Sequence, residues 1–459
     1  MDTVRAELLV IGFGKGGKTL AAAMGRAGKR VVLVEQSDQM YGGTCINIGC
    51  VPTKALVHQA DERRDEDEPG SWYRQAIGSV QSLTTLLRGN NFRMLDTIDA
   101  VTVVTGQATF VDPHTVEVRA GDDRLTITAD TIAINTGSLP VVPDIPGLAA
   151  GAHTVTSTDL LSTEDLPKHL AILGGGYLGV EFAAMYRRFG AEVTVFEAAE
   201  RMLGREDDDV AEAAVEILAG DGITLLTGSA VTALEDTGEC VTISYERGGE
   251  QRSLTADKVL VAAGRAPATD GLNLEAAGVD TGPRGSVVVD EYLRTSQPHI
   301  FALGDVNGGP QFTYISLDDS RVVLDQLAGA GKRSTADRVA VPTTVFMTPP
   351  LATVGLTEKA ARAAGHPVRV ARKAIGQIAA MPRSRIMGDT RGLMKFVIDS
   401  DTDRILGAAL LSIDAQELVN TVALAMRHGV TATELRDSIY THPSSTEAFN
   451  EVLATIVSN

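Results

Sequence analysis

Two stretches of this sequence repeat one pattern: an apolar strand, a glycine-rich turn, an alanine-rich helix, and a second strand that ends in an acidic residue. The first stretch is LLVIGFGKGGKTLAAAMGRAGKRVVLVE at residues 8–35. Its turn contains Gly12, Gly14 and Gly17, and its second strand ends at Glu35. Aromatic residues make up only 4% of the chain while glycine reaches 46 residues, a balance that favours α/β layers over an all-β sandwich.

The second stretch lies about one domain further along the chain, at residues 170–197. It reads LAILGGGYLGVEFAAMYRRFGAEVTVFE, and the residues in the same positions are Gly174, Gly176, Gly179 and Glu197. A helix that opens on such a turn binds a pyrophosphate at its N-terminus, and the acid is placed for ribose hydroxyls. A single turn of this kind would be weak evidence, but the strand and helix context is right twice. The chain is therefore predicted to bind two dinucleotides.

The remaining sequence indicates a third module. The 459 residues exceed what one core usually holds. From residue 341 onward, strands such as LMKFVID and ILGAALL precede a helix, AQELVNTVALAMRHG, without another glycine-rich turn. This part is predicted to be an α+β domain with a different task. The polar run at residues 58–72 is predicted to end a helix and to lie on the surface as solvated charge.

Charge and cysteine usage narrow the functional classes. The net charge of −18 argues against nucleic acid as a partner, because phosphate contacts require clustered Lys and Arg. No stretch has the length and apolarity of a membrane span, and the first apolar run is too short and too rich in glycine to serve as a secretion signal. Three cysteines cannot form a secreted disulfide framework, so a cytoplasmic location is expected. Any disulfide in this chain is then expected to be a working one.

Cys45 and Cys50 lie in GGTCINIGCVPTK, where a helical path across four intervening residues brings the two thiols near each other. A metal-binding pair and two inert buried thiols are the alternatives. Further metal ligands are missing, since Cys240 is isolated in what is expected to be a strand, so no metal site is predicted. A helix that begins at residues 43–45 would lower the thiol pKa through its dipole, as a reactive thiol requires.

His442 and Glu447 occur in THPSSTEAFNEV. A carboxylate that orients an imidazole is a common arrangement for a general acid or base. A His before Pro is more often a surface or capping residue, so these residues alone do not decide between the two roles.

The motifs taken together resemble those of the class I pyridine nucleotide-disulfide oxidoreductases, which include glutathione reductase, lipoamide dehydrogenase and mercuric reductase. The resemblance covers the whole chain. Its motifs are, in order, GFGKGG, GGTCINIGCVPTK, INTGS, GGGYLGVE, AAGRAP, IFALGD, VFMTPPLATVGLTE and THPSSTE. The runs MYGGTCINIGC, GGPQFTYISLDDSRVV and GKRSTADR also resemble a bacterial subgroup associated with resistance to reactive chlorine.

The resemblance implies two Rossmann-like domains and a dimerisation domain. It gives an FAD-binding domain at 1–148 and 269–337, an NAD(P)H-binding domain at 149–268, and an α+β dimerisation domain at 338–459. Besides the glycines and acids of the two turns, it assigns FAD and nicotinamide contacts to Gly43, Thr44, Thr136, Gly137, Gly264, Arg265, Gly304 and Asp305, with Asp305 on the ribityl chain. Tyr177 resembles a ring that covers the flavin until the nicotinamide arrives, and Lys54 with Glu181 resembles a pair beside flavin N5.

The implied reaction passes electrons from NAD(P)H through FAD to a Cys45–Cys50 disulfide and on to a small-molecule oxidant. Cys50 would be the thiolate beside the flavin, and Cys45 the attacking thiol. His442, oriented by Glu447, would act in the partner subunit of a homodimer, although Tyr440 stands where many relatives have another His. Glu197 favours NADH, but Arg201 and Arg205 are available for NADPH. The subgroup implies hypothiocyanous acid as the oxidant. Copper(II) or mercury(II), a low-molecular-weight disulfide and a dihydrolipoamide-type substrate are the alternatives.

Overall fold

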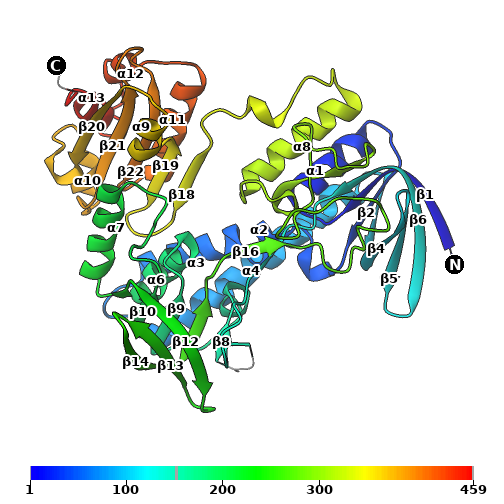
Figure 1. Cartoon of the computed structure of the whole chain (residues 1–459), viewed down its shortest axis with the longest axis horizontal. Coiled ribbons are helices and arrows are strands. Elements are labelled where there is room, and N and C mark those ends of the chain that lie inside the picture. The colour runs from blue at the N-terminus through cyan, green and yellow to red at the C-terminus, as the bar shows by residue number, and fades with distance from the viewer. Residues whose placement is uncertain (1, 150–152, 457–459) are drawn as a thin grey trace.

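The protein is described here from a computed structural model that covers residues 2–149 and 153–456. Figure 1 shows three regions: the N-terminal sheet at the upper right, a second sheet at the bottom, and a C-terminal region at the upper left. Both parallel sheets and the C-terminal antiparallel sheet match the predicted α/β and α+β organisation.

The first sheet contains the first glycine turn. Its parallel strands have the order β3-β2-β1-β6, β17 is parallel to β6, and the antiparallel strands β5 and β4 extend the other side of β6. All five residues of VVLVE in β2 are buried, because helices or loops cover a central parallel strand on both faces. The elements are β1 (Asp2–Ile11), α1 (Lys15–Arg26), β2 (Val31–Glu35), β3 (Val101–Thr105), β4 (Gln107–Asp112), β5 (Thr115–Ala120), β6 (Asp123–Ile134) and β17 (Ile300–Ala302).

A late part of the chain returns to this sheet. After β17, a short 3-10 helix η2 (Gly304–Asn307) leads to α8 (Thr313–Ala328), which packs against α1. Residues 300 positions apart therefore meet, as in the hydrogen bond from the Gly16 amide to the Ser316 hydroxyl, 3.0 Å. The first glycine turn is thus enclosed by segments from both ends of this region.

The second sheet contains the second glycine turn and has the parallel order β11-β10-β9-β15-β8. A three-stranded antiparallel sheet, β12-β13-β14, lies beside it, and the paired strands β7 and β16 connect the two regions. The elements are β7 (Ser138–Pro140), β8 (Thr154–Val155), α5 (Ser157–Leu160), β9 (His169–Leu173), α6 (Tyr177–Phe189), β10 (Glu192–Phe196), α7 (Asp208–Gly220), β11 (Thr224–Leu226), β12 (Ser229–Asp236), β13 (Val241–Arg247), β14 (Glu250–Ala256), β15 (Lys258–Val261) and β16 (Arg265–Pro267). Cys240 lies in the turn before β13 rather than in a strand, so that prediction is wrong.

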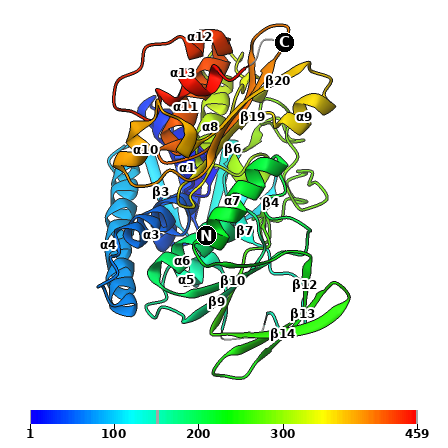
Figure 2. The same ribbon diagram turned by 90° about the vertical axis from the view of Figure 1, so that its left-hand side faces the viewer.

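The cysteine motif continues into a pair of long helices, seen side by side in Figure 2. These are α3 (Cys50–Glu62) and α4 (Pro69–Asp96), preceded by the short η1 (Asp38–Met40) and α2 (Thr44–Asn47). The polar run at residues 58–72 does end a helix, and Glu68 then caps α4 through the amides of Gly70 and Ser71. The last residues of the polar run, 69–72, belong to α4. There the Trp72 indole donates a hydrogen bond to the Gln59 carbonyl.

The C-terminal region is an antiparallel sheet, β18-β19-β22-β21-β20, covered by helices. The predicted strands LMKFVID and ILGAALL are β21 and β22, and the predicted helix is α11. The elements are η3 (Thr335–Asp337), β18 (Pro342–Val345), β19 (Leu351–Gly355), α9 (Glu358–Ala363), β20 (Val368–Ala374), η4 (Ile375–Gln377), α10 (Pro382–Ile386), β21 (Leu393–Asp399), β22 (Ile405–Leu411), α11 (Ala415–Arg427), α12 (Ala432–Arg436) and α13 (Ala448–Leu453). Within residues 2–149 and 153–456, no helix is both long and apolar enough to cross a membrane.

Candidate active site

One large cavity joins the features predicted from the sequence. It has a volume of about 2570 Å³, and both glycine turns, both motif cysteines and the β16 segment line it. Pockets for a single small ligand usually have a volume of about 300–1,000 Å³. The cavity is therefore larger than a site for one small ligand, and it extends from both glycine turns to the motif cysteines.

The first glycine turn fits a tightly held dinucleotide. Gly14 caps α1 without a side-chain cap, and no acidic residue lies in the first turn of the helix, so its amides and dipole face an anion. A Cβ on Gly12 would lie 2.3 Å from the Asn135 carbonyl oxygen, so only glycine allows this approach. The Asn135 side-chain oxygen accepts a hydrogen bond from the Gly17 amide at 2.8 Å. Glu35 is buried and accepts the Phe13 amide at 2.9 Å.

The second glycine turn repeats this geometry, but fewer neighbouring side chains enclose it. Gly176 caps α6, again with no side-chain cap and no acid in the first helical turn. Gly174 approaches the Ala262 carbonyl, and Gly179 packs against the carbonyl of Gly174. Glu197 accepts the amides of Gly175 and Ala199, each at 2.8 Å, as Glu35 does in the first turn. Both turns thus have the donor set and the space that a dinucleotide needs.

The cysteine motif lies directly on the first turn. Gly43 has φ +75°, and a Cβ there would lie 2.7 Å from the Gly14 Cα, so the loop before Cys45 packs against the pyrophosphate turn. Cys45 is in α2, and Cys50 is the first residue of α3. Both thiols are reduced, hydrogen bonded to each other and facing the cavity.

The two thiols ionise differently, which corrects the prediction for Cys45. The hydrogen bond from Cys45 lowers the pKa of Cys50 to about 6; burial opposes this shift, while Thr313 and Lys54 add to it. The pKa of Cys45 is raised, because Cys45 keeps the shared proton and is buried beside the Cys50 charge. The helix α2 has only four residues, whereas the longer α3 begins at Cys50 itself. The stabilised thiolate is therefore Cys50.

Lys54 and Glu181 lie together next to the cysteines. The Lys54 ammonium is 2.7 Å from Glu181 Oε2, and the other oxygen of Glu181 accepts the Phe346 amide at 2.9 Å. Lys54 also lies over the Phe346 ring, 4.8 Å from its centroid. Because Phe346 follows β18, the C-terminal region holds this ion pair in place.

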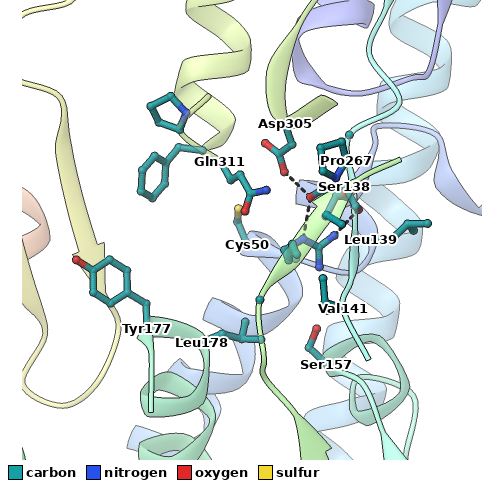
Figure 3. Close-up of a pocket in the computed structure, with 18 of the residues that line it drawn as sticks. Cys50, Ser138, Leu139, Val141, Ser157, Tyr177, Leu178, Pro267, Asp305 and Gln311 are labelled. Atoms are coloured by element: carbon teal, nitrogen blue, oxygen red, sulfur yellow. Dashed lines mark hydrogen bonds between the residues drawn. The ribbon is translucent and has the colours of Figure 1, made fainter. Parts of the chain in front are cut away.

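A polar cluster faces the cavity where the two sheets meet. Figure 3 shows Ser138, Asp305 and Cys50 on one side of the cavity and Tyr177 on the other. The Ser138 hydroxyl donates to Asp305 at 2.7 Å, and Arg265 donates to the Ser138 hydroxyl and carbonyl at 2.9 and 2.6 Å. The other predicted contacts on the cavity wall are Gly43, Thr44, Thr136, Gly137 and Gly264.

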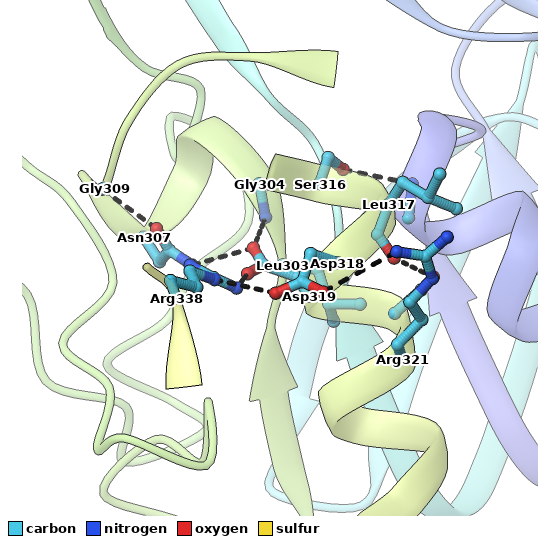
Figure 4. Close-up of polar contacts among 12 residues, drawn as sticks. Leu303, Gly304, Asn307, Gly309, Ser316, Leu317, Asp318, Asp319, Arg321 and Arg338 are labelled. Carbon is cyan, nitrogen blue, oxygen red and sulfur yellow. Dashed lines mark hydrogen bonds and ion pairs between the residues drawn. The ribbon is translucent and has the colours of Figure 1, made fainter. Parts of the chain in front are cut away.

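Gly304 is held from behind the cavity wall by an ionic cluster shown in Figure 4. Its amide donates to Asp319 at 2.6 Å, and Asp319 is fully buried, which raises the pKa of its carboxyl. Arg338 contacts Asp319 and lies 2.9 Å from Asp318. This cluster fixes the loop that presents Asp305.

His442 and Glu447 form a pair that lies apart from the cysteines of the same chain. His442 Nδ1 is 2.9 Å from Glu447, while the imidazole is 71% exposed and neither residue lines the cavity. Burial works to raise the pKa of Glu447, but the Ser444 amide and His442 outweigh it and lower that pKa. Tyr440 packs against Phe449 and donates to the Leu435 carbonyl. Within one chain, the pair is oriented but does not reach the dithiol.

Sequence reasoning missed four residues at this site. Thr313 Oγ1 lies 3.4 Å from the Cys50 sulfur, and Asn135 and Ser138 support the turn and Asp305. Glu206 binds Tyr177. Thr313 lies in GGPQFTYISLDDSRVV and Asn135 and Ser138 in INTGS, runs noted only for their resemblance, whereas nothing in the local sequence marks Glu206.

Comparison with known proteins identifies the family. Residues 6–320 match the pyridine nucleotide-disulphide oxidoreductase family, and residues 341–453 match the dimerisation domain of that family. The chain belongs to this family. The resemblance described from its motifs is therefore confirmed, and with it the class of FAD-dependent NAD(P)H disulfide oxidoreductases.

Individual relatives agree along the whole chain. The probable pyridine nucleotide-disulfide oxidoreductase RclA of Escherichia coli is 45% identical over 98% of this chain and 99% of that protein. A dihydrolipoyl dehydrogenase of Geobacillus stearothermophilus is 33% identical over 96% of this chain and 94% of its own length. The solved structure of E. coli RclA, described as an HOCl-induced flavoprotein disulfide reductase, superposes with a TM-score of 0.92, covering 98% of this chain and 100% of that one at 45% identity. Its Cu(II) complex gives a TM-score of 0.93 at 44% identity, over 99% of this chain and 100% of that one.

Among the described residues, no group of three or more His, Cys, Asp or Glu side chains has the arrangement of a metal site.

Proposed function

We propose that this protein uses NAD(P)H, through FAD, to reduce a Cys45–Cys50 disulfide whose dithiol then reduces hypothiocyanous acid. The observation that carries this proposal is the pair of hydrogen-bonded thiols in a cavity shared with two dinucleotide turns. The oxidant rests on the resemblance to the reactive-chlorine subgroup and on the similarity to a reductase described as HOCl-induced. A cytoplasmic location suits an enzyme that must keep its dithiol reduced.

The cofactor roles follow the two turns. FAD would lie on the first turn, with its pyrophosphate at the α1 amides, its ribose at Glu35 and its ribityl chain at Asp305. The nicotinamide dinucleotide would lie on the second turn, with Glu197 at its ribose. Bound FAD supplies two-electron transfer between the nicotinamide and the dithiol. Lys54 and Glu181 would present a fixed cation near the reacting ring.

The dithiol would react in two displacement steps. Cys45 gives up its proton and its sulfur attacks the sulfur of hypothiocyanous acid, so that an S–S bond forms, the S–O bond breaks and hydroxide leaves as water after protonation. The Cys50 thiolate then attacks the Cys45 sulfur, forms the disulfide and expels thiocyanate. The two thiols lose two electrons and the oxidant gains them. The raised pKa of Cys45 makes a nearby base necessary for the first step.

That base and acid would come from a second subunit. His442 is exposed and oriented by Glu447, yet it lies outside the cavity of its own chain, and the C-terminal region matches a dimerisation domain. In a homodimer, His442 of the partner subunit would accept the proton of Cys45 and return it to the leaving hydroxide. The His442→Ala variant should keep fast flavin reduction and lose about a hundredfold in reoxidation by the oxidant. Equal slowing of both half-reactions would instead point to a disturbed dimer.

The test is anaerobic oxidation of NADH and NADPH by purified enzyme with hypothiocyanous acid, glutathione disulfide, copper(II) and mercury(II) in parallel. We expect the highest kcat/KM with hypothiocyanous acid and at least roughly a thousandfold loss in Cys45→Ser. Cys240→Ser is the matched control, because Cys240 lies in a distant turn. Fast turnover of glutathione disulfide, or hypothiocyanous acid turnover that survives Cys45→Ser, would refute this substrate.

Copper(II) reduction is the second candidate, favoured by the similarity to the Cu(II) complex of E. coli RclA. Reduction of a metal ion needs accessible thiolates or flavin but no sulfur displacement. It should therefore tolerate His442→Ala, whereas hypothiocyanous acid reduction should not. A copper(II) rate that exceeds the hypothiocyanous acid rate under the same conditions would make the metal the preferred oxidant.

A further inference from the structure

The Tyr177 hydroxyl is hydrogen bonded to Glu206 and is also in contact with Thr343. Tyr177 is the first residue of α6, directly after Gly176, and it lines the large cavity. Its hydroxyl donates to Glu206 Oε1 at 2.5 Å. In Figure 3 the ring is directed to the side, away from Cys50 and the polar cluster around Ser138. The ring therefore lies in the part of the cavity that a dinucleotide bound at the second turn would also occupy.

Glu206 is a fixed acceptor rather than a mobile surface acid. Its side chain is buried, with 6% exposure. The neighbouring Asp207 accepts the amides of Glu358 and Lys359 at 2.8 and 3.1 Å, at the start of α9. The buried ammonium of Lys395 on β21 lies 3.1 Å from Asp207. The C-terminal region therefore braces the loop that presents Glu206.

The contact has the character of a strong hydrogen bond. Burial and the Glu206 charge both raise the pKa of the Tyr177 hydroxyl, so the phenol remains the donor. Burial also raises the pKa of Glu206, and the bond from Tyr177 partly offsets this. Short O–H···O⁻ bonds of this kind are roughly twice as strong as neutral ones. Breaking the bond would leave a buried carboxylate without this donor.

We propose that Glu206 is a positioning residue that holds the Tyr177 ring aside and so keeps open the path by which a nicotinamide on the second turn reaches the flavin on the first turn. This inference rests on the proposed function, because it assumes that the nicotinamide dinucleotide binds at the second turn. We call the Tyr177–Glu206 hydrogen bond the latch. Without it, the ring can enter the cavity and compete with the incoming nicotinamide. Glu206 then acts on binding of the hydride donor and leaves the dithiol chemistry alone.

The test is anaerobic stopped-flow reduction of the flavin over a range of NADH concentrations. Glu206→Ala should raise the apparent Kd for NADH on the order of tenfold, because only the fraction of molecules with the ring aside binds. The reduction rate at saturating NADH and the reoxidation rate should stay unchanged. Tyr177→Phe, which keeps the ring and loses the hydroxyl, should give the same shift. Glu206→Gln should restore most of the affinity, since its amide oxygen still accepts the bond.

The double variant decides between a latch and two separate effects. If the bond is the cause, Glu206→Ala combined with Tyr177→Phe raises the Kd no further than either change alone. Additive shifts, or a Tyr177→Phe enzyme with normal affinity, would overturn the latch. Glu212→Ala, an exposed acid on α7, is the matched control. If neither NADH nor NADPH reduces the wild-type flavin, the proposed function fails. If the wild-type flavin is reduced and Glu206→Ala behaves identically, only the latch fails.

Discussion

The two glycine turns are built alike but are covered differently. In each turn, the first glycine approaches a backbone carbonyl at the end of a neighbouring strand: Gly12 meets Asn135, and Gly174 meets Ala262. In the first turn, the Asn135 side chain also bonds the Gly17 amide and the Leu303 carbonyl, which closes the turn from behind. Ala262 has no side chain that could do the same.

The difference extends along both turns. A Cβ on Gly14 would lie 2.4 Å from the Asn135 side-chain oxygen, whereas a Cβ on Gly176 would meet nothing within 4 Å. Glu35 is buried, whereas its counterpart Glu197 is only partly buried. An enclosed turn suits a cofactor that stays bound, and an open turn suits one that must enter and leave in every cycle. If FAD lies on the first turn and the nicotinamide dinucleotide on the second, the same local motif would serve two kinetic roles because of what surrounds it.

The largest difference between the two turns is expected when one methyl group is added to each of them. Gly14→Ala should displace the Asn135 side chain and lower FAD affinity by about a hundredfold, because overpacking costs roughly 1–3 kcal/mol. Gly176→Ala should leave FAD content unchanged and shift the KM for NADH only slightly. Flavin absorbance per protein after gel filtration measures the first effect, and steady-state kinetics the second. Equal flavin loss in both variants would show that the two turns do not differ in enclosure.

Asn135→Ala gives the first turn the chemistry of the second. The change leaves the Gly17 amide and the Leu303 carbonyl without their partner, so FAD affinity should fall by at least about tenfold. Ala262→Val, an apolar change at the equivalent position, is the matched comparison and should not affect FAD content. The measurement is the FAD dissociation constant from flavin fluorescence. An unaltered constant in Asn135→Ala would mean that the cover of the first turn does not hold the cofactor.

A smaller effect is expected at Glu197, the partly buried acid of the second turn. Glu197→Ala should shift the ratio of kcat/KM for NADH over NADPH by about tenfold toward NADPH, because Glu197 is placed to bind a ribose diol and to repel a 2′-phosphate. Arg201 and Arg205 would then be the cations for that phosphate. Glu200→Ala, at an exposed neighbour, is the control. A wild-type enzyme that already prefers NADPH would show that the arginines outweigh the acid.

The smallest expected effect is a pH-dependent change in absorbance of the wild-type enzyme, which reports on the Cys50 thiolate next to the first turn. The reduced enzyme should show a long-wavelength charge-transfer band from the Cys50 thiolate to oxidised flavin. Because the pKa of Cys50 is lowered to about 6, the band should be full above that pH and fade as the pH falls through about 6. Absorbance titration of the two-electron-reduced enzyme measures this. A band that persists in Cys50→Ser would mean that the thiolate is not Cys50.

Much of the fold and of the site could be predicted from local sequence. The two strand, turn and helix units, the C-terminal strands and α11 all occur where their patterns predict them. These features depend on residues close together in the chain, whose apolar periodicity and glycines determine the local geometry. The proximity of Cys45 and Cys50 is local in the same sense.

Other features depend on residues far apart in the chain, and only the tertiary structure decides them. The contact with Thr313 helps to lower the pKa of Cys50, the thiolate that the resemblance implies, whereas the pKa of Cys45 is raised, against the helix-dipole prediction. Asn135 and Glu206 act through bonds that cross strands and domains. The sequence by itself determined the family, and with it the prediction of FAD, a nicotinamide dinucleotide and a Cys45–Cys50 redox pair. Packing between distant segments decided how the pKa of each thiol shifts and which turn is enclosed, because burial and long-range hydrogen bonds set the pKa values and the access of each site.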